Sequence, residues 1–259
     1  MQSQSPSPMQ REFTIEYDGN SIYGRISFPD GSGPWPLVIF SHGFGASHVY
    51  ESGMDRAFVE RSLAFAAFDF CGGGPESRSS GTMLDMSVLT EARDLNAVVD
   101  WARSDERVDE RRIFLLGSSQ GGYVSTYVAG ERQQDIAALA LFFPAFNIGA
   151  DAQIRSARHG GELPERLQIG PHVVGRRYND DAISVDIFDH IARFSGDVLI
   201  VHGAKDEIVP IEYSRRAVQA FGGTCKLEVI EELGHGFRAY PPALHERAIG
   251  MALDFFAAH

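Results

Sequence analysis

Short apolar runs alternate with segments of helical periodicity along most of the chain. Residues 13–17 and 21–26 alternate apolar and polar side chains around Asp18-Gly19-Asn20, which predicts a β-hairpin. Continuous apolar runs predict buried strands at residues 36–41, 63–70, 112–116, 136–143, 197–202 and 226–230. Apolar residues at helical spacing predict helices over residues 50–62, 87–104, 120–130, 212–221 and 243–257.

This alternation predicts an α/β fold with a mostly parallel sheet, to which the hairpin adds antiparallel edge strands. Residues 147–194 break the pattern, because they show no buried strand and are rich in Pro, Gly, Arg and His. A bare loop of that length is rare inside a compact domain. We therefore expect a core of residues 11–146 and 195–259, and an inserted subdomain of residues 147–194. The insertion follows a strand, at the sheet end where ligands bind in such folds, so we expect a cap over the site. An insertion that has no role at the site is the alternative.

Composition narrows the class of protein. The 259 residues carry 23 basic and 35 acidic side chains, and this net charge of −12 argues against nucleic acid or an anionic membrane as a partner. Cys71 and Cys225 lie far apart and outside any CxxC motif, which favours reduced thiols and a cytoplasmic location. The first ten residues are polar and lack the apolar core of a signal peptide, so we expect a disordered tail at residues 1–10.

The segment Gly117-Ser118-Ser119-Gln120-Gly121 lies between a predicted strand and a predicted helix. In that context G-x-S-x-G is typical of a sharp turn that exposes a nucleophilic serine at the end of a sheet. Glycines two residues to each side give the strand and helix room to meet, and this spacing selects Ser119 over Ser118. A glycine-rich turn with a capping serine is the alternative interpretation.

A serine nucleophile needs a general base, and that base needs an orienting carboxylate. Asp206 follows the strand at residues 197–202, and His235 follows the strand at residues 226–230 between two glycines. The order Ser, acid, His is the one that this strand–turn–helix arrangement uses. His202 lies on its strand, where we expect a packed structural histidine, and we expect Glu207 to cap a helix or face solvent. The sequence contains no HExxH motif and no close His/Asp cluster, so we expect no bound metal.

The reaction also needs backbone N–H groups aimed at an oxyanion. Gln120 supplies one from the start of the helix after Ser119. The second is expected from Phe44, in the loop His42-Gly43-Phe44-Gly45 after the strand at residues 36–41. A plain tight turn is the alternative for that loop.

These segments together resemble the α/β-hydrolases, and more narrowly the bacterial cinnamoyl (feruloyl) esterases. The S-H-G-F loop, the S-Q-G-G elbow and a cap after Phe143-Pro144-Ala145-Phe146 carry the resemblance. It implies hydrolysis of hydroxycinnamate esters, with the phenolic ring in a pocket formed by the cap, where Asp151 and Tyr178 match an acid and a tyrosine that meet the ring hydroxyls. Two departures concern pocket shape: Ser118 replaces the histidine of G-H-S-Q-G, and 72–74 are three glycines in place of G-H-G.

We therefore expect a serine carboxylic-ester hydrolase that needs no cofactor and acts on a small-molecule ester. A general carboxylesterase or thioesterase, and a non-catalytic binding protein on the same scaffold, are the alternatives. The oligomeric state is open, with a homodimer as one option.

Overall fold

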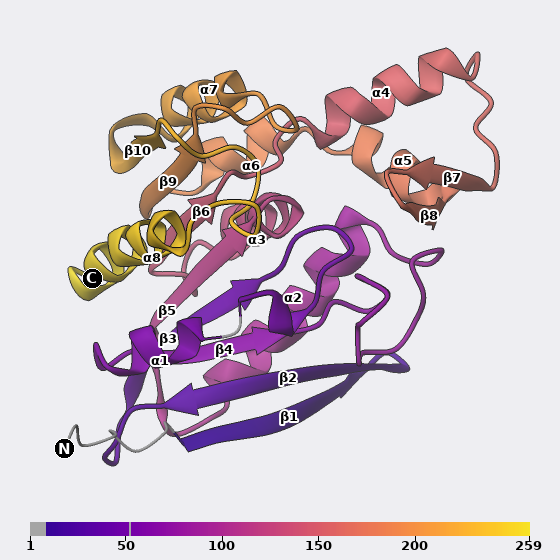
Figure 1. The fold of residues 1–259 in the computed structure, drawn as a ribbon. Coiled ribbons are helices and arrows are strands. Elements are labelled where there is room, and N and C mark those ends of the chain that lie inside the picture. The colour runs from indigo at the N-terminus through magenta and orange to yellow at the C-terminus, as the bar shows by residue number, and fades with distance from the viewer. Residues whose placement is uncertain (1–8, 52) are drawn as a thin grey trace.

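The computed structural model describes residues 9–51 and 53–259, and within them eight strands form one sheet (Figure 1). Their spatial order is β1-β2-β4-β3-β5-β6-β9-β10. The strands are β1 (Met9–Tyr17), β2 (Asn20–Phe28), β3 (Trp35–Ser41), β4 (Ala64–Phe68), β5 (Val108–Ser118), β6 (Ala138–Phe142), β9 (Asp197–Gly203) and β10 (Cys225–Ile230).

The sheet is parallel from β4 to β10, as the continuous apolar runs predict. The hairpin β1–β2 extends it at one edge, because β2 pairs antiparallel with both β1 and β4. The predicted fold class is therefore confirmed. Since all parallel strands end at the same edge, the loops after β3, β5, β6, β9 and β10 meet there.

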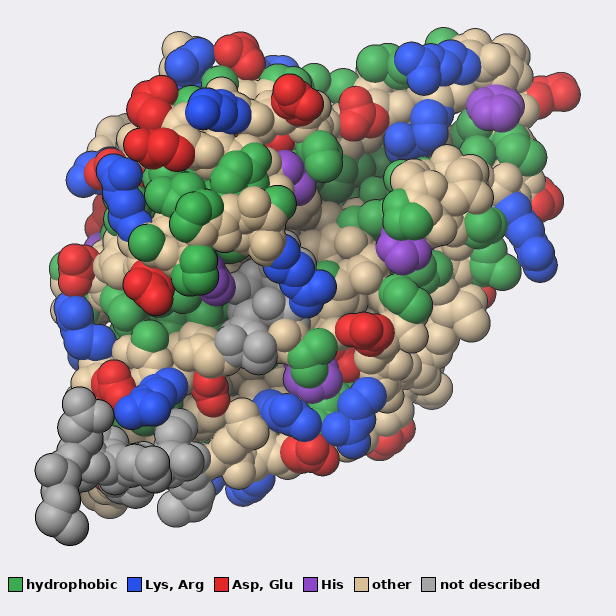
Figure 2. Space-filling model, viewed as in Figure 1, with side chains coloured by type: hydrophobic (Ala, Val, Ile, Leu, Met, Phe, Trp, Pro, Cys, Tyr) green, Lys and Arg blue, Asp and Glu red, His purple; other side chains and the backbone are tan. Residues whose placement is uncertain are grey.

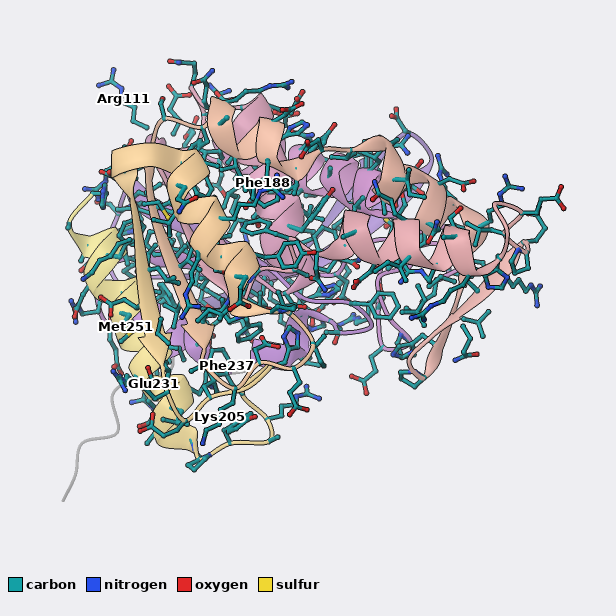
Figure 3. All side chains as sticks on the ribbon, turned by 90° about the horizontal axis from the view of Figure 1, so that it is seen from above. Arg111, Phe188, Lys205, Glu231, Phe237 and Met251 are labelled. Atoms are coloured by element: carbon teal, nitrogen blue, oxygen red, sulfur yellow. The ribbon has the colours of Figure 1, made fainter. Side chains whose placement is uncertain are left out.

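Helices cover both faces of the sheet. Helices α1 (Met54–Val59) and α8 (Pro242–Ala257) pack on one face, where Phe58 and Phe256 join one apolar cluster. The other face carries the larger cluster and the helices α2 (Val88–Arg103), α3 (Gln120–Glu131), α6 (Ile187–Arg193) and α7 (Ile211–Phe221). Side chains fill the space between these layers, as the view from above shows (Figure 3). No helix in the described part of the chain is both long and apolar enough to cross a membrane.

Two local predictions need correction. The predicted helix over residues 50–62 is a 3-10 turn at His48–Glu51 followed by the short α1. Gly53 adopts a left-handed conformation (φ 97°) directly before α1, which separates the two. The predicted tail falls mostly on residues 1–8, which lie outside the described residues, but Met9 and Gln10 already belong to β1.

Residues 147–194 contain two structurally different parts. Helices α4 (Ile148–Arg158) and α5 (Arg176–Ser184), with the two-stranded hairpin β7 (Arg166–Ile169) and β8 (His172–Gly175), stand off the end of the sheet (Figure 1). Helix α6 packs on α3 instead, and its Ile187 and Ile191 belong to the main core. The hairpin was missing from the sequence prediction, because its strands have four residues each and do not show a continuous apolar run.

Candidate active site

Ser119 occupies a strained turn between β5 and α3. Its backbone angles are φ 53° and ψ −120°, a region that L-residues rarely adopt. A Cβ on Gly117 would lie 2.5 Å from the carbonyl oxygen of Gly121, and one on Gly121 would overlap the carbonyl oxygen of Ser41. Strand, helix and the β3 loop therefore meet with no room for side chains, as the glycine spacing predicts. This packing holds the serine in its unusual conformation.

Ser119, His235 and Asp206, which the sequence places after the ends of three different strands, are connected by hydrogen bonds. The Oγ of Ser119 lies 3.0 Å from Nε2 of His235, and Nδ1 of His235 lies 2.8 Å from Oδ2 of Asp206. His235 keeps 17% of its side chain exposed, whereas the Asp206 side chain is fully buried. With the Nδ1 proton donated to Asp206, Nε2 is free to accept the proton of Ser119.

Asp206 is held in its ionised form. Burial alone would raise its pKa, but hydrogen bonds from His202, His235 and the backbone N–H of Val209 outweigh burial and keep the pKa well below its ordinary value. The N–H groups of Ile208 and Val209 donate to Oδ1 at 2.9 and 2.8 Å. The carboxylate is therefore fixed in both charge and orientation.

His202 is a fully buried histidine on β9, as expected, but it also contacts the site. Its Nδ1 lies 2.7 Å from Oγ of Ser214, and its Nε2 lies 3.0 Å from the carbonyl oxygen of Val209 and 3.2 Å from Oδ2 of Asp206. The sequence signal for this contact is the spacing of four residues across the strand exit, which brings His202 back against the carboxylate.

The loop after β3 runs directly against Ser119. A Cβ on Gly43 would lie 3.2 Å from Cβ of Ser119. Nε2 of the buried His42 accepts the backbone N–H of Phe70 (3.1 Å), so its ring proton lies on Nδ1 and is donated to the carbonyl oxygen of Gly43 (2.9 Å). Burial lowers the pKa of His42, which favours this neutral form. His42 thus shapes the loop that carries Phe44.

A hollow of about 260 Å³ opens beside Ser119 and His235. Its remaining walls are mostly apolar or small: Gly43, Phe44, Ala46, Ser118, Phe143, Ile208 and Gly236. The ring of Phe143 lies 4.9 Å from the His235 ring, and Phe143 also has a positive φ of 39°. This hollow suits an apolar acyl group next to the serine.

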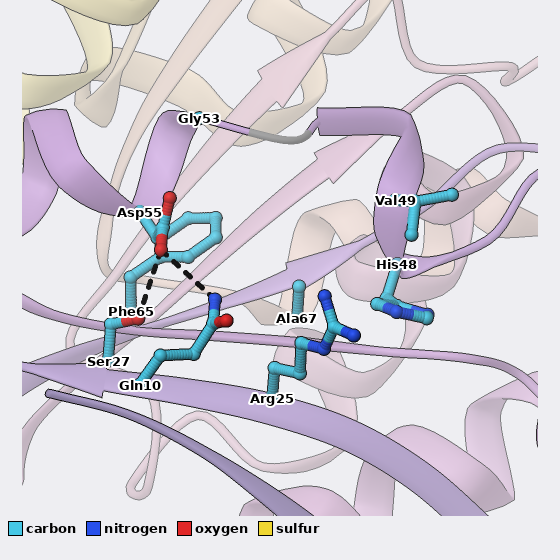
Figure 4. Close-up of a pocket in the computed structure, with 9 residues that line it drawn as sticks. All are labelled: Gln10, Arg25, Ser27, His48, Val49, Gly53, Asp55, Phe65 and Ala67. Carbon is cyan, nitrogen blue, oxygen red and sulfur yellow. Dashed lines mark hydrogen bonds between the residues drawn. The ribbon is translucent and has the colours of Figure 1, made fainter. Parts of the chain in front are cut away.

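A separate pocket of about 90 Å³ lies between β2, β4 and α1 (Figure 4). There Asp55 accepts hydrogen bonds from Ser27 and Gln10. This pocket shares no lining residue with the hollow at Ser119.

On the face in Figure 2, acidic and basic side chains are interspersed. Among the described residues, no group of three or more His, Cys, Asp or Glu is placed to hold a metal ion.

The side chain of Gln120 is buried and bonded at both ends. Its Nε2 donates to Oε2 of Glu91 (2.8 Å), and its Oε1 accepts from the hydroxyl of Tyr178 (2.8 Å). Burial raises the pKa of Glu91 to about 8. The sequence prediction missed Glu91, although its position three residues after Val88 and four before Leu95 puts it on the apolar face of α2.

The two cap residues singled out from the sequence do not line the hollow at Ser119. Asp151 lies in the first turn of α4, is exposed, and accepts a hydrogen bond from Asn147 (2.9 Å). Tyr178 lies on α5 and is only 5% exposed. The structure therefore brings Ser119, Asp206, His235, Phe44 and Gln120 together, and places Tyr178 behind Gln120 and Asp151 farther out on the cap.

A family model, Hydrolase_4, described as "Serine aminopeptidase, S33", matches residues 33–173, more than half of the sequence. The chain belongs to the α/β-hydrolase family. The strained serine, the sheet order and the strand-exit loops are thus features of a serine hydrolase fold, and esterases are among its relatives.

Two of the curated relatives each match just under half of the chain. An uncharacterised Escherichia coli protein is 33% identical over 119 residues, which cover 46% of this chain and 39% of that protein. Esterase EstD of Thermotoga maritima is 26% identical over 119 residues, which cover 45% of this chain and 29% of the esterase. The chain thus matches well under two thirds of the length of these relatives.

A solved structure matches nearly the whole chain. Est1E from Butyrivibrio proteoclasticus, solved with ferulic acid bound, superposes with a TM-score of 0.81 at 25% identity, over 93% of this chain and 98% of Est1E. The predicted resemblance to the feruloyl esterases is therefore confirmed at the level of fold and family.

Proposed function

We propose that this protein is a carboxylic-ester hydrolase that acts through a covalent acyl-enzyme on Ser119. The observation that carries the proposal is the chain of hydrogen bonds from Ser119 through His235 to Asp206, at a turn whose strain exposes the serine. Nε2 of His235 takes the proton of Ser119 as Oγ attacks the ester carbonyl carbon. Asp206 holds the imidazole and stabilises its charged form.

The carbonyl oxygen gains negative charge in this step, and the backbone N–H groups of Gln120 and Phe44 are the proposed donors to it. Gln120 is the first residue of α3, so its N–H has no partner within the helix. His235 then gives its proton to the leaving alcohol. Water, activated by His235, attacks the acyl-enzyme and releases the acid, which restores Ser119.

The test compares wild type with Ser119→Ala on a short p-nitrophenyl ester. We expect kcat to fall by on the order of 10⁴-fold or more, as in other enzymes that lose a triad nucleophile. Ser118→Ala is the comparison variant: it removes the neighbouring hydroxyl, which lines the hollow, and leaves the hydrogen-bonded chain intact, so its loss of kcat should be far smaller than that of Ser119→Ala. Equal rates for wild type and Ser119→Ala would reject Ser119 as the nucleophile. A fluorophosphonate probe that fails to label folded wild type would favour the non-catalytic alternative.

We further propose that the substrates are hydroxycinnamate esters and that the cap, residues 147–194, forms the pocket for the aromatic ring. The likeness to Est1E, solved with ferulic acid bound, supports the substrate class. The apolar walls of the hollow suit the acyl part of such an ester, although the lining residues of the hollow lie outside the cap. Asp151 remains the predicted contact for a ring hydroxyl. The test is kcat/KM for methyl ferulate against an aliphatic methyl ester of similar size. A preference for the aliphatic ester would leave a general carboxylesterase or thioesterase.

A further inference from the structure

Tyr178 joins the cap to both segments that carry the proposed oxyanion donors. Its hydroxyl donates to Oε1 of Gln120 at 2.8 Å, and its ring centroid lies 5.5 Å from that of Phe44. The side chain is nearly fully buried. One cap residue therefore touches the residue after the nucleophile and the residue in the loop opposite.

Gln120 has no freedom to turn away from this arrangement. Its amide nitrogen is held by Glu91 on α2, and its amide oxygen is held by Tyr178 on α5. A buried amide with both ends bonded keeps one rotamer, because any other leaves polar atoms without partners. Since Gln120 begins α3, fixing its side chain also limits movement of its backbone N–H.

Phe44 is held from the cap as well. Its ring packs against His172 of β8 (centroids 5.5 Å apart) and against Tyr178, at the edge of a small apolar cluster that includes Leu167 and Val174. Without the cap, the Phe44 ring would lose these contacts.

We propose that Tyr178 is a positioning residue for the oxyanion hole, rather than a contact for a substrate ring hydroxyl. Its one hydroxyl proton is used by Gln120 and its ring by Phe44, so it orders the two N–H donors relative to Ser119. Removal of the hydroxyl therefore slows the chemical step for every ester, whatever its acyl group. This inference rests on the proposed function.

The test is Tyr178→Phe, which keeps the ring against Phe44 and removes only the hydrogen bond to Gln120. Steady-state rates are measured on p-nitrophenyl acetate, methyl cinnamate and methyl ferulate. We expect kcat to fall about tenfold on all three esters with KM changed less than twofold, a smaller loss than removal of an oxyanion donor gives. Tyr127→Phe, on the same helix as Gln120, is the control and should keep wild-type rates.

A second variant, Gln120→Met, tests whether Tyr178 acts on kcat through the side chain of Gln120. It keeps the backbone N–H but removes both side-chain hydrogen bonds, so adding Tyr178→Phe to it should cause no further loss of kcat. Independent losses that multiply would overturn the proposal. So would a loss confined to methyl ferulate with a raised KM, which is the result for a ring-hydroxyl contact.

The failure of this inference is distinct from failure of the proposed function. Wild-type rates for Tyr178→Phe, with Ser119→Ala inactive, overturn the role of Tyr178 and leave the hydrolase mechanism standing. Wild-type rates for both variants overturn both.

Discussion

The strain at Ser119 predicts that the proposed nucleophile is held at the expense of folding stability. Its conformation (φ 53°, ψ −120°) costs an L-residue about 1–3 kcal/mol. Glycine adopts this region without that cost, but it loses about 0.5–1 kcal/mol more conformational entropy than alanine on folding. Ser119→Gly and Ser119→Ala both remove the hydrogen bond to His235, so that loss cancels between them.

We therefore expect Ser119→Gly to be more stable than Ser119→Ala by about 1 kcal/mol. For a chain of this size that difference raises Tm by about 2–4 °C. Urea unfolding and thermal melts of the two variants measure it directly. Both variants should be inactive.

Ser156, in the regular helix α4, provides the matched control. There glycine should be less stable than alanine by about 0.5–1 kcal/mol, because the backbone angles are ordinary. If Ser119→Ala equals or exceeds Ser119→Gly in stability while the Ser156 pair behaves as expected, the reasoning from strain is refuted.

Two further predictions concern buried positions. Burial raises the pKa of Glu91 from 4.5 to about 8. Between pH 4.5 and pH 8 the folded chain therefore keeps a proton on Glu91 that the unfolded chain releases. Over this range the contribution of Glu91 to the free energy of unfolding falls by up to about 1.4 kcal/mol per pH unit. Glu91→Gln should flatten this decline in urea unfolding at pH 5 to 8, and equal slopes would contradict it. Gly121→Ala should lower the free energy of unfolding by about 3 kcal/mol or more, because the new Cβ overlaps backbone oxygens. Gly250 in α8 is the control, because a Cβ there meets open space. Gly250→Ala should raise the free energy of unfolding by about 0.5–1 kcal/mol. Similar effects of the two glycine changes would contradict that reading.

Local sequence signals were sufficient for most of the sheet and for the chain of hydrogen bonds at Ser119. Each of Ser119, Asp206 and His235 follows a strand whose apolar run is visible in the sequence, and parallel strands bring their ends to one edge whatever lies between them. The sharp turn at Ser119 could be derived from the spacing of Gly117 and Gly121, which lie two residues to each side of it.

Pairings between distant buried polar residues could not be derived in this way. Glu91 contacts Gln120, and Tyr178 reaches it from the cap, only because helices of different segments pack together. His48 is likewise buried, and its Nδ1 lies 2.8 Å from Oδ1 of Asp69, 21 residues away. Such contacts depend on tertiary packing, which the spacing of apolar residues along the sequence does not reveal.

The strands on either side of the cap have a consequence for how such proteins can diversify. The β6 strand ends before the cap and β9 begins after it, and the two are direct neighbours, with Ala138 opposite Asp197 and Phe142 opposite Val201. The part of this segment that carries α4, β7, β8 and α5 is thus an insertion between β6 and the crossover helix α6, and its length does not enter the pairing of the sheet. A different cap could be grafted at this junction with the nucleophile, acid and base left in place. Any graft would, however, have to supply its own partner for the amide of Gln120.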